Sequence, residues 1–203
     1  MTPVILIPCK DLDRGKSRLA ACLTPRSRRA LCEFFLCRTL DVATATVSPA
    51  HVRVVTSDPR VRAIAGEYGV GVIADREGNL NGALECGRRR ILADIGDCAG
   101  LVLPIDLPLA TPATLGAIAG APQDVVIVPD EAMEGTNVLR LGPRALPRFR
   151  FAFGPHSYAA HCAVARAAGF EVRTVSAPSL AFDVDGPEQY RRWAPENPEW
   201  GET

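Results

Sequence analysis

The chain has 203 residues, and its 23 basic and 23 acidic side chains give a formal net charge of zero. A protein that binds nucleic acid usually carries a basic excess or stripe, so this balance argues against that class. Hydrophobic residues make up 47% of the chain, which is enough apolar material for a core and argues against disorder. We expect one domain over residues 1–203, with a loose proline-rich tail over 195–203.

The cysteines and the N-terminus indicate where such a protein works. The seven cysteines form no C-x-x-C pair and lie mostly in apolar runs, where a reduced thiol behaves as a small hydrophobe. The first apolar run, residues 4–7, is too short for a signal peptide, and no stretch approaches the ~20 apolar residues that a membrane span needs. We therefore expect a cytoplasmic protein that binds neither membrane nor nucleic acid.

Short apolar runs of β-type residues alternate with helical patterns over the first part of the chain. Strands are predicted at residues 4–7, 52–56, 70–74, 101–103 and 125–128, and helices at residues 25–45, 59–68, 81–95 and 112–119. Strands with continuous apolar runs are typical of sheets that are buried on both faces. Their alternation with helices indicates right-handed crossovers and a mostly parallel sheet.

The pattern changes after Pro129. Strand patterns at residues 136–141 and 149–153 follow each other without a helix between them, which predicts an antiparallel addition to the sheet. A helix at residues 157–168, a strand at 172–175 and a helix at 187–193 complete the chain. We therefore predict an α/β fold with three layers, α/β/α, around a mostly parallel sheet.

The loop after the first strand is rich in cations. Its basic residues are Lys10, Arg14, Lys16 and Arg18. Because ligands of open α/β sheets bind beyond the carboxyl ends of the strands, cations here suit a polyphosphate or another anion. The segment Gly15-Lys16-Ser17 matches only the end of the phosphate-binding pattern G-x-x-x-x-G-K-[ST], whose first glycine is absent. A solvated basic loop is the alternative interpretation.

Three aspartates are candidates for binding a cation. Asp106 stands between Pro104 and Pro108, just after a predicted strand. Proline fixes φ, so this carboxylate is held where it can bind a divalent cation against phosphate oxygens. Asp183 and Asp185 are two residues apart, so in an extended segment both would face one site and favour a cation between them. The alternatives are a turn aspartate that caps the next helix and two surface aspartates beside a Gly-Pro turn.

Two segments combine glycine with hydroxyl residues, Gly135-Thr136-Asn137 and Gly154 to Ser157. Their backbone N–H groups can approach an anion, and Ser157 opens a predicted helix whose N-terminus favours a phosphate or carboxylate. A turn and an N-cap explain these residues equally well. His156 and His161 share no helical face and have no third ligand nearby in sequence, which argues against a zinc site.

Taken in order, these segments resemble the 2-phospholactate guanylyltransferase family of coenzyme F-420 biosynthesis, which includes the phosphoenolpyruvate and 3-phosphoglycerate guanylyltransferases. The matching segments are Ile7 to Lys10, Gly15 to Leu19, Leu80 to Leu84, Leu103 to Pro108, Pro129-Asp130, Gly135 to Asn137, Phe153 to Ser157 with His161, and Asp183 to Asp185. They cover almost the whole chain, and the ordered set is far more specific than any one segment. Cys9 and Gly82 depart from the family pattern, but neither removes a charge or a ligand.

The resemblance implies a MobA-like nucleotidyltransferase fold, similar to glycosyltransferase A, with Mg²⁺ as cofactor. The metal ligands that it implies are Asp106, Asp183 and Asp185. The residues that would bind the acceptor acid are Lys16, Thr136, Gly154 and Ser157. Those that would bind the nucleotide are Pro8, Lys10, Lys16, Asn81 and Pro104. Those with a catalytic role would be Lys16, Arg18 and Asp106.

The implied activity is transfer of GMP from GTP to the phosphate of a small acid, with release of pyrophosphate. The residues leave the acceptor open among 2-phospho-L-lactate, phosphoenolpyruvate and 3-phospho-D-glycerate. The product would pass to a second transferase, and a homodimer is compatible with the fold.

Three other functions are weighed against this one. The first is a related enzyme that uses CTP or UTP with another phosphorylated acceptor. The signature L-A-G-G-x-S-x-R-M-G of the molybdenum-cofactor enzymes is absent after the first strand, which disfavours that branch of the fold. The second is a non-catalytic nucleotide-binding domain, and the presence of all three aspartates argues against it. The third is a structural oligomerisation module, for which the sequence gives no positive sign.

Overall fold

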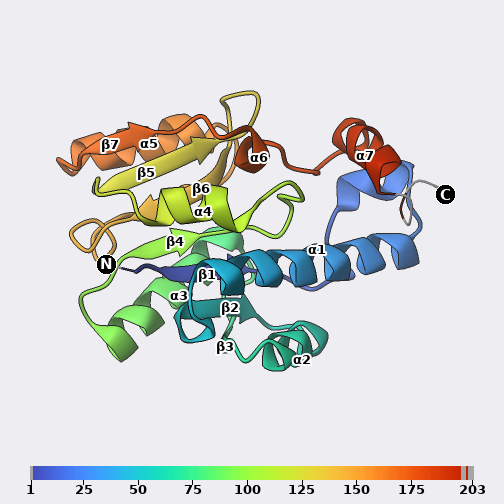
Figure 1. The fold of residues 1–203 in the computed structure, drawn as a ribbon, viewed down its shortest axis with the longest axis horizontal. Helices are drawn as coiled ribbons and strands as arrows, with labels where there is room; N and C mark the ends of the chain where they lie inside the picture. The colour runs from blue at the N-terminus through green and yellow to red at the C-terminus, as the bar shows by residue number, and fades with distance from the viewer. Residues whose placement is uncertain (1, 198–199, 201–203) are drawn as a thin grey trace.

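The computed structural model describes residues 2–197 and residue 200. Seven strands form one sheet in the order β3-β2-β1-β4-β6-β5-β7 (Figure 1). They span Val4–Pro8 (β1), Val52–Thr56 (β2), Gly71–Ala74 (β3), Gly100–Val102 (β4), Val125–Pro129 (β5), Thr136–Leu141 (β6) and Val172–Thr174 (β7). Strand β6 is antiparallel to β4 and β5, and the other described pairings are parallel. The mostly parallel sheet is therefore confirmed, and its antiparallel strand lies inside the sheet.

Several of the helices begin at capping residues that the sequence displays. They span Pro25–Thr46 (α1), Pro59–Glu67 (α2), Leu80–Ile95 (α3), Pro112–Ala119 (α4), Ser157–Ala167 (α5), Pro178–Ala181 (α6) and Pro187–Trp193 (α7). Thr24, Asp58 and Thr111 each accept a backbone N–H of the first turn, and each precedes a proline at the first helical position. These local signals explain why the sequence predicted these helix starts well.

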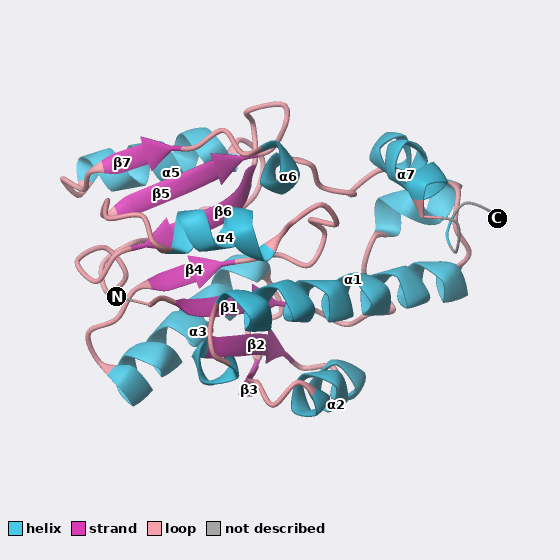
Figure 2. Cartoon of the chain, in the orientation of Figure 1, coloured by secondary structure: helices cyan, strands magenta, loops and turns pink. Residues whose placement is uncertain are grey.

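Helices cover both faces of the sheet (Figure 2). Alternate residues of β1 point to opposite faces. Ile5 and Ile7 belong to the core shared with α1, α2, α4 and α6, whereas Val4 and Leu6 belong to the core shared with α3 and α5. All four side chains are fully buried. The predicted three-layer α/β/α arrangement is therefore confirmed.

The segment 149–153 is not a strand, so this part of the prediction is wrong. Its backbone finds side-chain partners instead of a neighbouring strand. Ala152 N donates to His161 Nε2 at 3.0 Å, and Phe153 N donates to Asn81 Oδ1 at 2.8 Å. The aromatic rings of the segment pack in the core on the α3 and α5 face, which accounts for the alternating pattern that resembled a strand.

The described part of the C-terminal tail is packed on the protein. Ala194–Glu196 forms a 3-10 helix, and the Trp200 ring lies 5.6 Å from the Phe34 ring of α1. The indole gains apolar contact with α1 in this position, and the loose tail over 195–203 stays a prediction. Positions 198–199 and 201–203 lie outside the described residues, and the single-domain boundary over 1–203 stays a prediction.

Within the described residues, no helix is long and apolar enough to cross a membrane.

Candidate active site

A cavity of about 230 Å³ opens beside the first loop and the segment that follows β4. Of the residues singled out in the sequence, those that line it are Pro8, Lys10, Lys16, Asp106 and Asp185. Parallel strands end at the same edge of a sheet, so the loops after β1 and β4 meet there although they are far apart in sequence. The cavity thus joins the basic first loop to two of the three candidate carboxylates.

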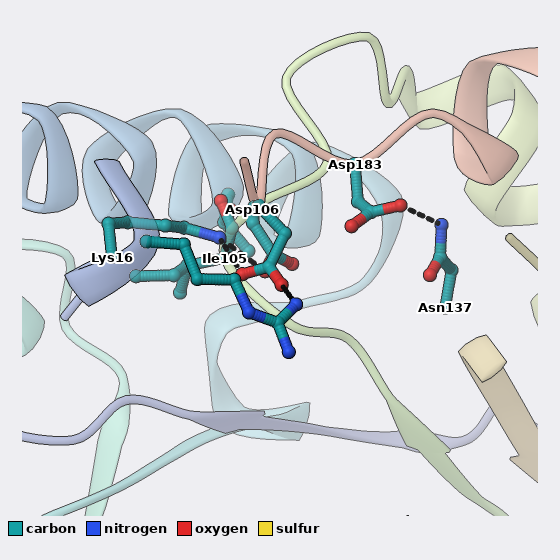
Figure 3. Close-up of polar contacts among 8 residues, drawn as sticks. Lys16, Ile105, Asp106, Asn137 and Asp183 are labelled. Carbon is teal, nitrogen blue, oxygen red and sulfur yellow. Dashed lines mark hydrogen bonds and ion pairs between the residues drawn. The ribbon is translucent and has the colours of Figure 1, made fainter. Parts of the chain in front are cut away.

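Lys16 is the buried cation of this cavity. Its backbone is left-handed, with φ 51° and ψ 41°, just before a 3-10 helix at Ser17–Ala21. Its side chain is 6% exposed, and its Nζ donates to Asp106 at 2.6 Å and to Asp185 at 3.5 Å (Figure 3). Burial lowers the pKa of Lys16, but attraction to Asp106 and Asp185 outweighs it and leaves the pKa above its ordinary value. A charged ammonium therefore lines the cavity, where it can bind a phosphate.

The segment with the other two aspartates is hydrogen-bonded to the backbone of Asp106. Val184 N donates to Asp106 O at 3.0 Å, and the Val184 side chain is fully buried. The carboxylate of Asp185 pairs with Arg18 and with Lys16. The predicted catalytic cations and two predicted metal ligands are thus in direct contact with one another.

Asp183 lies on the other side of Val184. Burial, and then the neighbouring Asp106 carboxylate, raise the pKa of Asp183 from 3.8 to about 6. Asn137 donates to Asp183 at 3.5 Å and, more closely, to two backbone carbonyls at the end of α6, at 3.1 and 2.9 Å. Asn137 therefore holds the chain that leads to Asp183 (Figure 3).

The two candidate carboxylates that line the cavity, with Asp183 close to Asp106, have the donor chemistry that a hard divalent cation prefers. Burial first, and then repulsion from Asp106, raise the pKa of Asp183, and a cation beside these carboxylates would relieve the repulsion. Across residues 2–197 and 200, however, no three His, Cys, Asp or Glu side chains are grouped closely enough to hold a metal ion. The ammonium of Lys16 lies between Asp106 and Asp185 instead. The residues fit a cation in their chemistry, and the metal site itself stays a prediction.

A second group of predicted residues meets where β6 and α5 begin. Thr136 N donates to Ser157 Oγ at 2.9 Å, and Thr136 Oγ1 lies 2.9 Å from His161 Nδ1. Thr136 is 7% exposed, Ser157 3% and His161 0%. These hydroxyls are thus held by the protein itself, next in sequence to Asn137 and its contact with Asp183.

The remaining predicted residues lie around these two groups. The Asn81 amide donates to Phe153 O at 2.9 Å and accepts from Phe153 N at 2.8 Å, so both of its polar atoms hold the segment before α5. Gly154, with φ 144°, begins the turn into α5. Lys10 Nζ donates to the carbonyl of Gly78 at 3.3 Å. Pro104 lies in the connection between β4 and Asp106.

Sequence reasoning missed the part that Asn137 and His161 play in this site. Both stood in the segments that carried the resemblance, yet neither was given a role. A signal was present for His161, because it lies four residues after Ser157 and therefore on the same face of α5. Asn137 gave no such signal, since its partners are more than 40 positions away.

The chain has an α/β fold with a basic loop and carboxylates at one edge of the sheet. Solved structures agree on the fold. A nucleotidyl transferase from Methanothermobacter covers 96% of this chain and 97% of its own, with a TM-score of 0.68 and 18% identity. CMP:2-keto-3-deoxy-manno-octonic acid synthetase, solved with CTP, covers 95% and 96%, with a TM-score of 0.63 and 15% identity. A Mycobacterium tuberculosis protein solved with manganese covers 95% and 98%, with a TM-score of 0.57 and 19% identity.

The chain belongs to the family described as Guanylyl transferase CofC like, whose model matches residues 3–192. A phosphoenolpyruvate guanylyltransferase of Rubrobacter xylanophilus is 41% identical over 196 residues, which cover 95% of this chain and 93% of the relative. One from Chloroflexus aggregans is 38% identical, with coverage of 93% and 95%. The predicted family is therefore confirmed, and the chain is an enzyme of guanylyl transfer.

Proposed function

We propose that this protein transfers GMP from GTP to the phosphate of phosphoenolpyruvate and releases pyrophosphate. The observation that carries the choice of acceptor is the name of the relatives, which are 41% and 38% identical over nearly their whole length. 2-Phospho-L-lactate and 3-phospho-D-glycerate are the other acceptors to test, since these phosphorylated acids differ from phosphoenolpyruvate by the double bond, a hydroxyl or the place of the phosphate.

In the proposed reaction an oxygen of the acceptor phosphate attacks the α-phosphorus of GTP. The bond from that phosphorus to the bridging oxygen breaks, and pyrophosphate leaves with the bonding electrons. A phosphate monoester is already anionic at neutral pH, so the attack needs little help from a general base. The protein then acts by positioning the two anions and offsetting their charge.

Lys16 and Arg18 are proposed to offset the charge that builds on the departing pyrophosphate. The positions of these two side chains support this role, because both contact the carboxylates beside the cavity. The first loop with Pro8, Lys10 and Pro104, and the segment at Asn81, would hold the nucleotide. Thr136, Gly154 and Ser157 would receive the acceptor together with Lys16.

A divalent cation, which we take to be Mg²⁺, would be held by Asp106, Asp183 and Asp185. It would supply positive charge against the phosphates of both substrates. The support is the three-carboxylate set and a structural neighbour of the same fold that was solved with manganese. We place the reaction in coenzyme F-420 biosynthesis and expect a second transferase to consume the product, because the new phosphoanhydride bond makes it a reactive donor. A homodimer remains compatible with this function.

The test uses the purified protein with GTP and Mg²⁺, and each of the three acids in a separate reaction; parallel reactions contain CTP or UTP in place of GTP. Pyrophosphate release is followed with time, and the nucleotide product is identified by its mass. Release with phosphoenolpyruvate and not with GTP alone would support the proposal. Release only with another acid would change the acceptor, and release only with CTP or UTP would overturn guanylyl transfer.

A further inference from the structure

His161 is a fully buried histidine with a defined partner on each ring nitrogen. Ala152 N lies 3.0 Å from Nε2, and Thr136 Oγ1 lies 2.9 Å from Nδ1. The ring packs edge-on against Phe153, with ring centroids 4.6 Å apart, and beside Phe149 at 5.7 Å. These contacts fix where the imidazole lies and how it is turned.

The two contacts also decide which nitrogen carries the proton. A backbone N–H can only donate, so Nε2 must accept from Ala152 and bear no hydrogen. Burial lowers the pKa of His161 to about 4, so the ring is neutral at pH 7. A neutral imidazole carries one hydrogen, which is therefore on Nδ1 and is donated to Thr136 Oγ1.

This assignment leaves the hydrogen of the Thr136 hydroxyl free to be donated. The oxygen of Ser157 likewise accepts from Thr136 N, so the Ser157 hydrogen is free as well. Among the described residues, neither hydroxyl has another hydrogen-bond partner. Two buried O–H donors on residues that contact each other suit an anionic oxygen, because such bonds are about twice as strong as those to a neutral acceptor.

We propose that His161 is a positioning residue, which holds the Thr136 hydroxyl so that its hydrogen is directed to an anionic group of the acceptor acid. The proposal rests on the proposed function for the identity of that acid. In this proposal His161 does not contact the acceptor acid. It acts only by donating to the Thr136 oxygen, so that the hydroxyl does not donate its hydrogen to the imidazole.

The position of the ring is in turn held by Asn81. Its amide bonds both polar backbone atoms of Phe153, the residue after Ala152. Asn81 thereby holds the chain one residue after the Ala152 N–H that sets the tautomer. The link runs from α3 through the segment 149–153 to α5 and β6.

Two substitutions separate the roles of the ring nitrogens. His161→Asn keeps a donor near the position of Nδ1, whereas His161→Gln keeps an acceptor near Nε2 and loses the bond to Thr136. We expect His161→Gln to raise KM for the acid about tenfold and to change KM for GTP less than twofold. We expect His161→Asn to raise KM for the acid clearly less than His161→Gln does. Thermal unfolding of both variants controls for loss of folding.

A double-mutant cycle tests whether His161 acts through Thr136. If it does, His161→Gln adds nothing to the KM of a Thr136→Val variant. Full additivity would overturn the proposal, since it would mean a general structural role. Equal effects on the KM of the acid and of GTP would do the same. These comparisons need only an active wild type with some acceptor, so failure of the proposed function appears first, as a wild type without activity.

Nuclear magnetic resonance of the wild type tests the tautomer without any activity assay or variant. Long-range ¹H–¹⁵N spectra of the imidazole rings should show the His161 hydrogen on Nδ1 at pH 7. A hydrogen on Nε2 would overturn the proposal directly, because Nδ1 would then accept from the Thr136 hydroxyl and use up its hydrogen.

Discussion

Asp183→Asn should stabilise the metal-free protein, although we place Asp183 among the metal ligands. The pKa of Asp183 rises from 3.8 to about 6 because the carboxylate is buried and lies near Asp106. At about 1.4 kcal/mol for each pKa unit, this is a cost of about 3 kcal/mol for the ionised form. Because the side chain is only half-buried, we discount the expected gain to about 1.5 kcal/mol. The amide of the variant can still accept from Asn137.

The effect should depend on pH in a defined direction. The folded protein binds a proton at Asp183 more tightly than the unfolded chain does, so this group favours folding below a pH of about 4. That contribution is lost as the pH rises through about 6. The asparagine variant has no such loss. The difference in the free energy of unfolding should thus be near zero at a pH of about 4 and reach its full value above a pH of about 7.

Urea unfolding in the presence of a chelator, followed by tryptophan fluorescence, measures this difference. Asp185→Asn is the matched control, because that carboxylate pairs with Lys16 and Arg18, so its removal should bring no gain. A variant at Asp183 that is no more stable than the wild type at pH 8, or a gain that is equal at every pH, would refute the reasoning. Adding Mg²⁺ should stabilise the wild type more than the variant, since a ligand that binds the folded state stabilises it.

Three further substitutions test the site and the core. Asp106→Asn should lower kcat by about 10²- to 10³-fold with an unchanged circular dichroism spectrum, and near wild-type activity at saturating Mg²⁺ would show that the metal assignment is wrong. Ser157→Ala should raise KM for the acid about tenfold and spare KM for GTP, whereas equal changes in both would argue against an acceptor site there. Phe35→Ala should lower the free energy of unfolding by about 3–5 kcal/mol, because the ring is fully buried and packs against Trp193 with centroids 5.1 Å apart. A loss below about 1 kcal/mol would mean that α1 and α7 do not share a packed core.

Much of the fold could be predicted because its signals are local. The strand at residues 52–56 and the helix at residues 112–119 were predicted with the bounds that they have in the structure. Capping residues and buried apolar runs act over a few neighbours, so the sequence displays them directly. The prediction of a strand at residues 149–153 was wrong because it too relied on a local signal. Its alternating apolar residues look like a strand locally, but a strand exists only if a second strand pairs with it.

For the candidate site, too, some properties could be predicted from the sequence and others could not. The sequence by itself determined which side chains are chemically suited to phosphate and metal, namely the first-loop cations, the three aspartates and the two hydroxyls. Only the tertiary structure decided their partners, such as Lys16 with Asp106, which lie 90 positions apart in sequence, and Thr136 with His161. The physical reason is that charge and hydrogen-bonding capacity belong to single residues, whereas burial and distance, which set pKa values and tautomers, arise when distant segments pack together.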